Sequence, residues 1–95
     1  MKKFYGYFVY NNEQYVIRFK LGGSIKWDEE AHCFIDEKMY MRSAAYMICL
    51  AALDTHFANE KEFSCCAFII PKKDFIEYRS QGIKRWKPQR EIIIW

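Results

Sequence analysis

Four cysteines and two histidines are the residues of this chain best suited to metal binding or nucleophilic chemistry. They are Cys33, Cys49, Cys65, Cys66, His32 and His56. Zinc sites use Cys and His in closely spaced pairs such as C-x-x-C, and the sequence contains no such pair. A thiol nucleophile would pair Cys33 or Cys65 with His56, but hydrophobic neighbours raise the pKa of a thiol and weaken it. We therefore expect no metal site, no cofactor and no catalytic cysteine.

The acidic cluster Asp28-Glu29-Glu30 is a second candidate for chemistry, because carboxylates can hold a magnesium ion. Three consecutive acidic residues are more often a solvated turn, and we favour that interpretation. The sequence also lacks a Gly-rich phosphate loop, a nucleophile elbow and a carboxylate–lysine nuclease signature. These patterns argue against an enzyme without excluding one.

Charged residues are distributed unevenly along the 95 residues. Residues 1–20 carry a net charge of +3, residues 21–71 carry −4, and residues 72–95 carry +4. In the last segment, Lys84-Arg85-Trp86-Lys87 places an indole among cations, which can hold a phosphate backbone while the ring stacks on a base. Trp and Arg are also frequent anchors of protein interfaces. A third interpretation is a solvated loop whose Trp86 packs into the core.

These features define a candidate surface for binding a protein partner or a nucleic acid. Its residues are Arg18, Lys20, Lys72, Lys73, Arg79, Lys84, Arg85, Trp86, Lys87 and Arg90. A pI of about 8.7 is lower than that of a typical nucleic-acid-binding domain, which favours the protein partner. Nucleic-acid binding through Arg18, Lys20 and residues 84–87 would instead predict an affinity that falls steeply with salt.

The helix that must organise the fold is centred on residues 44–53, which contain no charge, Gly or Pro. Asp36 and Glu37 lie upstream and His56 lies downstream, where a helix favours negative and positive charge respectively. We therefore predict one long central helix over residues 37–57. Because its middle turns are apolar on all sides, it must be buried on more than one side. Ten such residues are too few to cross a bilayer, which needs roughly 20.

Three methionines fall in or beside this predicted helix, namely Met39, Met41 and Met47. Core and helix filling is their simplest role, whereas exposed methionines would indicate a surface that binds a partner.

Period-two patterns predict the strands. Residues 3–10 and 15–21 form an antiparallel hairpin with a turn at residues 11–14. Residues 63–70 are apolar on both faces, which is typical of an interior strand covered on each side. Residues 91–95 form the last strand. Residues 25–35 fit either two short strands around the acidic cluster or a helical turn.

A second, short helix is expected from Pro71 to about Ser80, with Phe75, Ile76 and Tyr78 packing inward. Gly82 ends it, and a basic loop follows over residues 83–89. The order β-β-(β)-α-β-α-β predicts the α+β class, with both helices on one side of a mainly antiparallel sheet. A chain of this length forms one domain, residues 1–95.

The composition is 52% hydrophobic and 19% aromatic, more apolar surface than a small domain can hide. A protein partner or a homodimer formed through an edge strand would cover the surplus. The short Tyr-rich run after Met1 lacks a cleavage site, so we do not interpret it as a signal peptide. Cysteines without a disulfide spacing indicate reduced thiols, and we expect a cytoplasmic protein with no membrane partner.

Our functional hypothesis is a small non-catalytic binding module, of the inhibitor or adaptor type, that docks on a larger macromolecule. A protein is the expected partner, and nucleic-acid binding is the alternative. Accessory proteins of phages and mobile elements often have this size and this lack of motifs, which is an analogy only.

Overall fold

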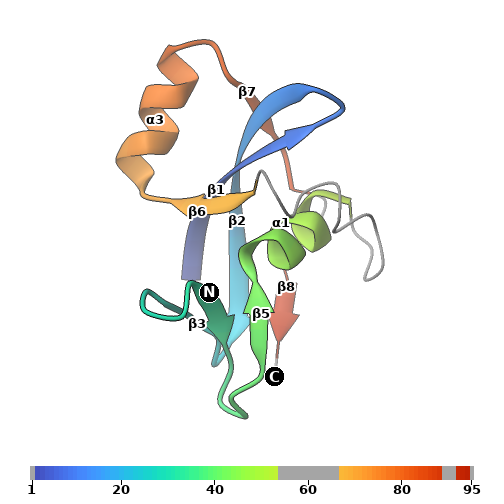
Figure 1. The fold of residues 1–95 in the computed structure, drawn as a ribbon, viewed down its shortest axis with the longest axis vertical. Helices are drawn as coiled ribbons and strands as arrows, with labels where there is room; N and C mark the ends of the chain where they lie inside the picture. Colours follow the sequence, from blue (N-terminus) through green and yellow to red (C-terminus); the bar gives the residue numbers. More distant parts are fainter. Residues whose placement is uncertain (1, 54–66, 89–91, 95) are drawn as a thin grey trace.

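The computed structural model describes residues 2–53, 67–88 and 92–94, and these residues form two sheets and two helices (Figure 1). The strands are β1 (Lys2–Tyr10), β2 (Glu13–Gly23), β3 (Lys26–Asp28), β4 (Cys33–Ile35), β5 (Met41–Ser43), β6 (Phe68–Ile70), β7 (Lys84–Trp86) and β8 (Ile92–Ile94). The helices are α1 (Ala44–Leu53) and α3 (Lys72–Ser80). The predicted α+β class with mostly antiparallel pairing is confirmed.

β1 and β2 form a long antiparallel hairpin in which each residue of β1 has a partner in β2. Asn11 and Asn12 turn the chain with positive φ angles of 51° and 63°. Two-residue turns with positive φ follow the twist of the flanking strands, and Asn tolerates this conformation better than most residues. The predicted hairpin is confirmed, and its strands are longer than predicted.

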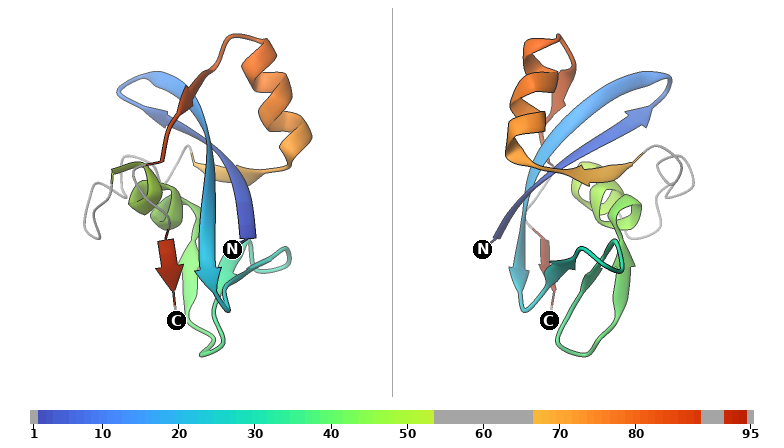
Figure 2. Two further views of the ribbon diagram at one scale, coloured as in Figure 1. Left: turned by 180° about the vertical axis from the view of Figure 1, so that it is seen from behind. Right: turned by 60° about the vertical axis from the view of Figure 1, so that its left-hand side comes forward.

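Three more strands complete a five-stranded sheet in the order β6-β1-β2-β7, with β8 also paired to β2. β6 is antiparallel to β1. β7 and β8 both run parallel to β2, β7 beside its first half and β8 beside its last residues (Figure 2). The predicted interior strand is therefore wrong in its position, because β6 lies at the edge of the sheet that the described residues form. Of the predicted residues 63–70, residues 63–66 lie outside the described part of the chain.

The two helices lie on opposite faces of the five-stranded sheet. Successive strand residues point to opposite faces, so the contacts of β1 identify the helix on each face. A Cβ added to Gly6 would lie 2.8 Å from Cδ1 of Ile48 in α1. The ring of the neighbouring Tyr5 instead contacts Phe75 of α3, with 5.0 Å between centroids. The prediction of both helices on one side is wrong, because β1 carries apolar side chains on two faces that both need cover.

α1 is ten residues long, so the predicted long helix over residues 37–57 is wrong at its start. Ser43 sets the start, because its Oγ accepts a hydrogen bond of 3.0 Å from the N–H of Tyr46 and caps the helix. Residues 37–43 instead form a turn and β5. The expectation for residues 54–57 lies outside the described residues.

The side chains of α1 are buried on nearly every side. From Ala44 to Ala52 only Tyr46 reaches the surface, and it does so in part. The helix contacts β1, β2 and β6 of the larger sheet, and its buried side chains share one core cluster with Phe34 of the smaller sheet. The prediction that a sheet and a second element cover this apolar segment is therefore confirmed.

β3, β4 and β5 form a separate antiparallel sheet, which decides for strands over a helical turn in residues 25–35. Phe34 in β4 is fully buried and joins the two sheets. Its ring meets Phe4 of β1 edge-on with 5.0 Å between centroids, and it meets Trp27 of β3 at 4.9 Å. Interlocked rings of this kind pack the layer between the sheets.

α3 confirms the predicted second helix. Pro71 precedes its first turn, and Gly82 follows its end with a φ angle of 94° that favours glycine. Phe75 and Tyr78 contact the sheet, but Ile76 is 57% exposed and does not pack inward as predicted. A helix that packs on a sheet buries one stripe of its surface, and Ile76 lies off that stripe among the described residues.

The predicted basic loop over residues 83–89 contains strand β7, which was not predicted. The predicted last strand is described over Ile92–Ile94. No helix in the described residues is both long and apolar enough to span a membrane.

Candidate protein-docking surface

One buried carboxylate, that of Asp36, organises the loop between β4 and β5. Its Oδ1 accepts hydrogen bonds from the N–H groups of Lys38 (2.9 Å) and Tyr40 (3.1 Å). Its Oδ2 accepts one from Nη1 of Arg42, at 2.8 Å. An Asp side chain that bonds the backbone two and four residues ahead favours a turn over a helix. This competition explains why the helix does not start at residue 37.

Other hydrogen bonds hold the same loop. The N–H of Met39 donates to the carbonyl of Asp36 at 2.9 Å, with Met39 at a φ angle of 64°. The N–H of Glu37 donates to Oγ of Ser24 at 3.3 Å. Each of the four consecutive N–H groups of residues 37–40 thus has an acceptor. A loop whose donors are all bonded is ordered before it meets a partner.

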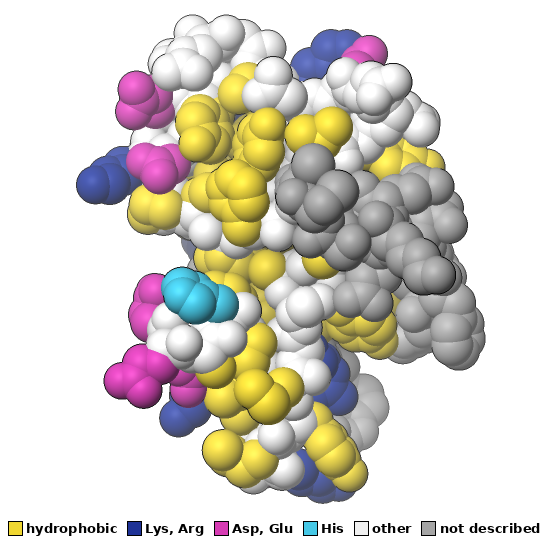
Figure 3. Space-filling model, viewed as in Figure 1, with side chains coloured by type: hydrophobic (Ala, Val, Ile, Leu, Met, Phe, Trp, Pro, Cys, Tyr) yellow, Lys and Arg dark blue, Asp and Glu magenta, His cyan; other side chains and the backbone are white. Residues whose placement is uncertain are grey.

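This loop presents three consecutive large hydrophobic side chains to solvent. Met39 is 69% exposed, Tyr40 is 62% exposed and Met41 is 67% exposed. Hydrophobic side chains are visible at the lower end of Figure 3, where the β4–β5 hairpin lies, and the hairpin extends beyond the rest of the fold in Figure 2. Single exposed hydrophobic residues are ordinary, but three consecutive ones on a projecting hairpin indicate an interaction site. We call residues 39–41 the docking tip.

The ion pair at the base of the docking tip is strong enough to keep Asp36 charged. Burial alone would raise the pKa of the Asp36 carboxyl. The hydrogen bonds from Arg42 and from the N–H groups of Tyr40 and Lys38 outweigh burial, and the pKa lies below its usual value. Asp36 is therefore ionised at neutral pH, and its charge strengthens the hydrogen bonds that it accepts.

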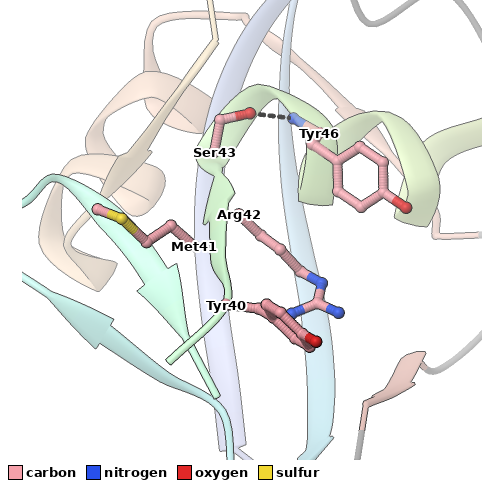
Figure 4. Close-up of a pocket in the computed structure, with 5 residues that line it drawn as sticks. All are labelled: Tyr40, Met41, Arg42, Ser43 and Tyr46. Atoms are coloured by element: carbon pink, nitrogen blue, oxygen red, sulfur yellow. Dashed lines mark hydrogen bonds between the residues drawn. The ribbon is translucent and has the colours of Figure 1, made fainter. Parts of the chain in front are cut away.

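A shallow cavity of about 430 Å³ adjoins the docking tip, lined by Tyr40, Met41, Arg42, Ser43 and Tyr46. Figure 4 shows Tyr40, Arg42 and Tyr46 on the same side of β5, while Met41 points to the other side. Two phenol rings and a guanidinium are residue types that anchor protein interfaces. The cavity thus extends the docking tip toward α1.

The predicted basic and aromatic residues of β7 are divided between the two faces of the large sheet. Arg85 is paired with Val16 and lies with its guanidinium 5.7 Å from the ring centre of Phe75, on the α3 face. Trp86 is paired with Ile17 and lies on the α1 face. One nucleic-acid strand therefore cannot stack on Trp86 and contact Arg85 on the same surface.

Trp86 is part of the packing between β7 and α1. Its Nε1 donates a hydrogen bond of 3.1 Å to the carbonyl of Ala52 in α1. Its ring meets Phe8, Tyr10 and Tyr15 edge-on, with centroids 5.0–5.8 Å apart. These contacts support the interpretation in which the indole packs into the core.

Most of the other predicted basic residues lie on β2, α3 and β7. Arg18 and Lys20 alternate with buried residues of β2 and share the α3 face with Arg85. Lys72, Lys73 and Arg79 belong to α3, and Arg79 donates to the carbonyl of Ile83. Lys84 forms an exposed ion pair with Glu13 at 3.0 Å, which lowers the pKa of Glu13 and raises that of Lys84. Lys87 is exposed, and Arg90 lies outside the described residues.

The residues weighed for chemistry do not assemble into a reactive centre within the described part of the chain. Cys33 and Cys49 are buried thiols, while Cys65, Cys66 and His56 lie outside the described residues. The Asp28 carboxylate accepts hydrogen bonds from the N–H groups of Glu30 and Ala31, as expected of a turn. No group of three metal-ligating side chains occurs among the residues described.

Comparison with known proteins adds no relative. The chain matches no family model, no curated protein and no solved structure. The function must therefore be argued from the geometry of the chain itself.

Sequence patterns alone do not place the docking tip at the surface. They favour core and helix filling for Met39 and Met41, with a partner-binding surface as the alternative, and they give Tyr40 no role. The signal was present in Asp36, a turn-favouring residue, and in Ser43, a helix-capping residue just before the uncharged run. Together they predict that the helix begins at residue 44 and that the methionines precede it.

Proposed function

We propose that this chain is a non-catalytic binding module that docks on a larger protein through the docking tip. The observation that carries the proposal is the exposure of Met39, Tyr40 and Met41 on a loop that Asp36 holds rigid. Methionine adapts its shape to an apolar surface, and tyrosine adds a large ring with a polar end. Because the loop is ordered in advance, little conformational entropy is lost on docking.

A triple variant, Met39→Ser, Tyr40→Ser and Met41→Ser, tests the proposal. Tagged wild-type protein and variant are used for quantitative affinity purification from the source cells. The wild type should retain a partner protein that the variant loses by about tenfold or more, since interface anchors each contribute about 2 kcal/mol. The melting temperature should stay nearly unchanged, because these side chains are exposed.

Ile76→Ser is the matched control, since Ile76 is comparably exposed but lies on α3, away from the docking tip. It should retain the partner as the wild type does. Equal recovery of the same proteins by the wild type and the triple variant would refute the proposal.

Nucleic-acid binding is the second candidate, and the strand register supports it in one respect. Lys3 is directly opposite Lys20, and Tyr5 is opposite Arg18, so these cations share the α3 face with Arg85. Several cations on one face of a sheet are a surface that a polyanion can contact. In this candidate function, the affinity for nucleic acid falls steeply with salt because of the cations on the α3 face. Trp86, on the opposite face, takes no part in the binding.

A further inference from the structure

A cavity of about 540 Å³ opens where β6 leaves the five-stranded sheet. β6 pairs with β1 only opposite Tyr5, Gly6 and Tyr7, and Pro71 then directs the chain into α3. Proline has no N–H to continue the ladder. Lys3 and Phe4 of β1 therefore have no strand beside them on this side within the described residues. The cavity therefore lies beside the edge of β1 at Lys3 and Phe4, which is unpaired in the described part of the chain.

The turn between β3 and β4 closes the other side of this cavity. Glu29 and His32 of that turn are among the lining residues. The Asp28 carboxylate holds the turn by accepting hydrogen bonds from the N–H groups of Glu30 (2.9 Å) and Ala31 (3.0 Å). The cavity is thus bounded by two sheets and is not a gap within one of them.

One part of the lining is aromatic and rigid. Phe4 and Trp27 both line the cavity, and both rings pack edge-on against the fully buried Phe34. Tyr5 also lines it and is held against Phe75 of α3. Aromatic rings fixed in this way offer flat surfaces on which a heterocyclic base can stack.

Another part of the lining is cationic. Lys3, on the edge of β1, and Lys72, at the start of α3, both line the cavity. Neither forms an ion pair with a described residue. Two ammonium groups on the wall of one cavity attract an anion into it. The carboxylate of Glu29 supplies an acceptor for hydroxyl or amine donors.

We propose that this cavity binds a nucleoside 5′-monophosphate. The base lies against the aromatic surface of Phe4 and Trp27, the phosphate lies between Lys3 and Lys72, and Glu29 accepts hydrogen bonds from the sugar or the base. The volume falls in the range of about 300–1,000 Å³ that small-molecule sites occupy. The proposal is independent of the docking tip, because the two sites share no residue.

The test is a titration of the isotope-labelled full chain, followed by amide chemical shifts. The probes are AMP, GMP, CMP and UMP, with adenosine and inorganic phosphate as partial ligands. At least one nucleotide should bind with a Kd of about 1 mM or lower and shift residues of β1 and of the β3–β4 turn. Adenosine and phosphate should each bind about tenfold or more weakly, because each offers only half of the contacts.

The variant Lys3→Gln/Lys72→Gln removes both cations and should weaken nucleotide binding by about tenfold or more. Lys73→Gln is the matched control, since Lys73 is an exposed neighbour of Lys72 that does not line the cavity. It should change the affinity by less than about twofold.

Three results would overturn the proposal. One is the absence of shifts with all four nucleotides, and another is an equal loss of affinity in Lys73→Gln, which would indicate unspecific charge attraction. The third result comes from a titration with a 5′-phosphorylated single-stranded oligonucleotide, which distinguishes a free nucleotide from the end of a nucleic acid. If it binds about tenfold more tightly than every mononucleotide, the ligand is a nucleic-acid end and not a free nucleotide.

Discussion

Replacing Trp86 tests whether it belongs to the core or to a binding surface. Trp86→Ala removes a hydrogen bond to the carbonyl of Ala52 and edge-on contacts to three rings. A hydrogen bond contributes about 1 kcal/mol, and an aromatic pair adds about 0.5–1.5 kcal/mol to its buried area. Replacing a fully buried Trp by Ala lowers the free energy of unfolding by about 3–5 kcal/mol. Trp86 is half-buried, so its replacement should cost less. We expect a loss of roughly 2–4 kcal/mol in the free energy of unfolding.

Urea denaturation followed by circular dichroism measures this loss. In a domain of this size 1 kcal/mol corresponds to about 4–8 °C, so the melting temperature should fall by about 8 °C or more. Trp86→Phe keeps a ring but loses the hydrogen bond, and it should cost about 1 kcal/mol. Lys87→Ala is the control, since Lys87 is exposed. A melting temperature that Trp86→Ala leaves unchanged would refute the packing argument and return the indole to the candidate binding surface.

Two further predictions concern the packing of α1 and the loop of the docking tip. Gly6→Ala would place a Cβ 2.8 Å from Cδ1 of the buried Ile48, and it should cost roughly 1–3 kcal/mol. Adding Ile48→Val removes that Cδ1, so the double variant should lose less stability in urea than the two single variants together; strict additivity would contradict the contact. Because the pKa of Asp36 is lowered by folding, its stabilisation is present above the ordinary carboxyl value of 3.8 and is lost as the pH falls below it. Asp36→Asn should therefore flatten the acid limb of a stability–pH curve, and an unchanged limb would show that Asp36 does not contribute to it.

Local patterns in the sequence were sufficient where neighbouring residues determine the structure. The hairpin of β1 and β2 follows from alternating side chains and from two Asn residues, which tolerate positive φ. α3 follows from Pro71 before it and Gly82 after it. In each case the residues that specify the element lie inside it or beside it.

The errors arose where distant residues decide. The strand β7 forms because β2, about 70 residues earlier, offers it an edge, and no short window contains that information. Once β7 is known to be a strand, its alternation separates Arg85 from Trp86 without further data. Likewise, the division of the helices between two faces depends on which face of β1 each helix reaches.

The start of α1 was mispredicted for a reason that also bears on function. The sequence predicts that Asp36 and Glu37 supply negative charge at a helix N-terminus, a role that requires the side chain of Asp36 to stay in solvent. Its carboxylate instead turns inward to Arg42 and to two backbone N–H groups, and this makes the loop more ordered than a frayed helix end would be.

The position of the docking tip is fixed from both sides of the hairpin. On one side β4 is buried over its whole length, and on the other β5 leads directly into the cap of α1 at Ser43. β4 cannot move without disturbing the core, so the hairpin presents residues 39–41 from a fixed base. Substitutions in an interface change the affinity of a complex chiefly through its dissociation rate. Substitutions in the docking tip should therefore shorten the lifetime of the complex while leaving its rate of formation nearly unchanged.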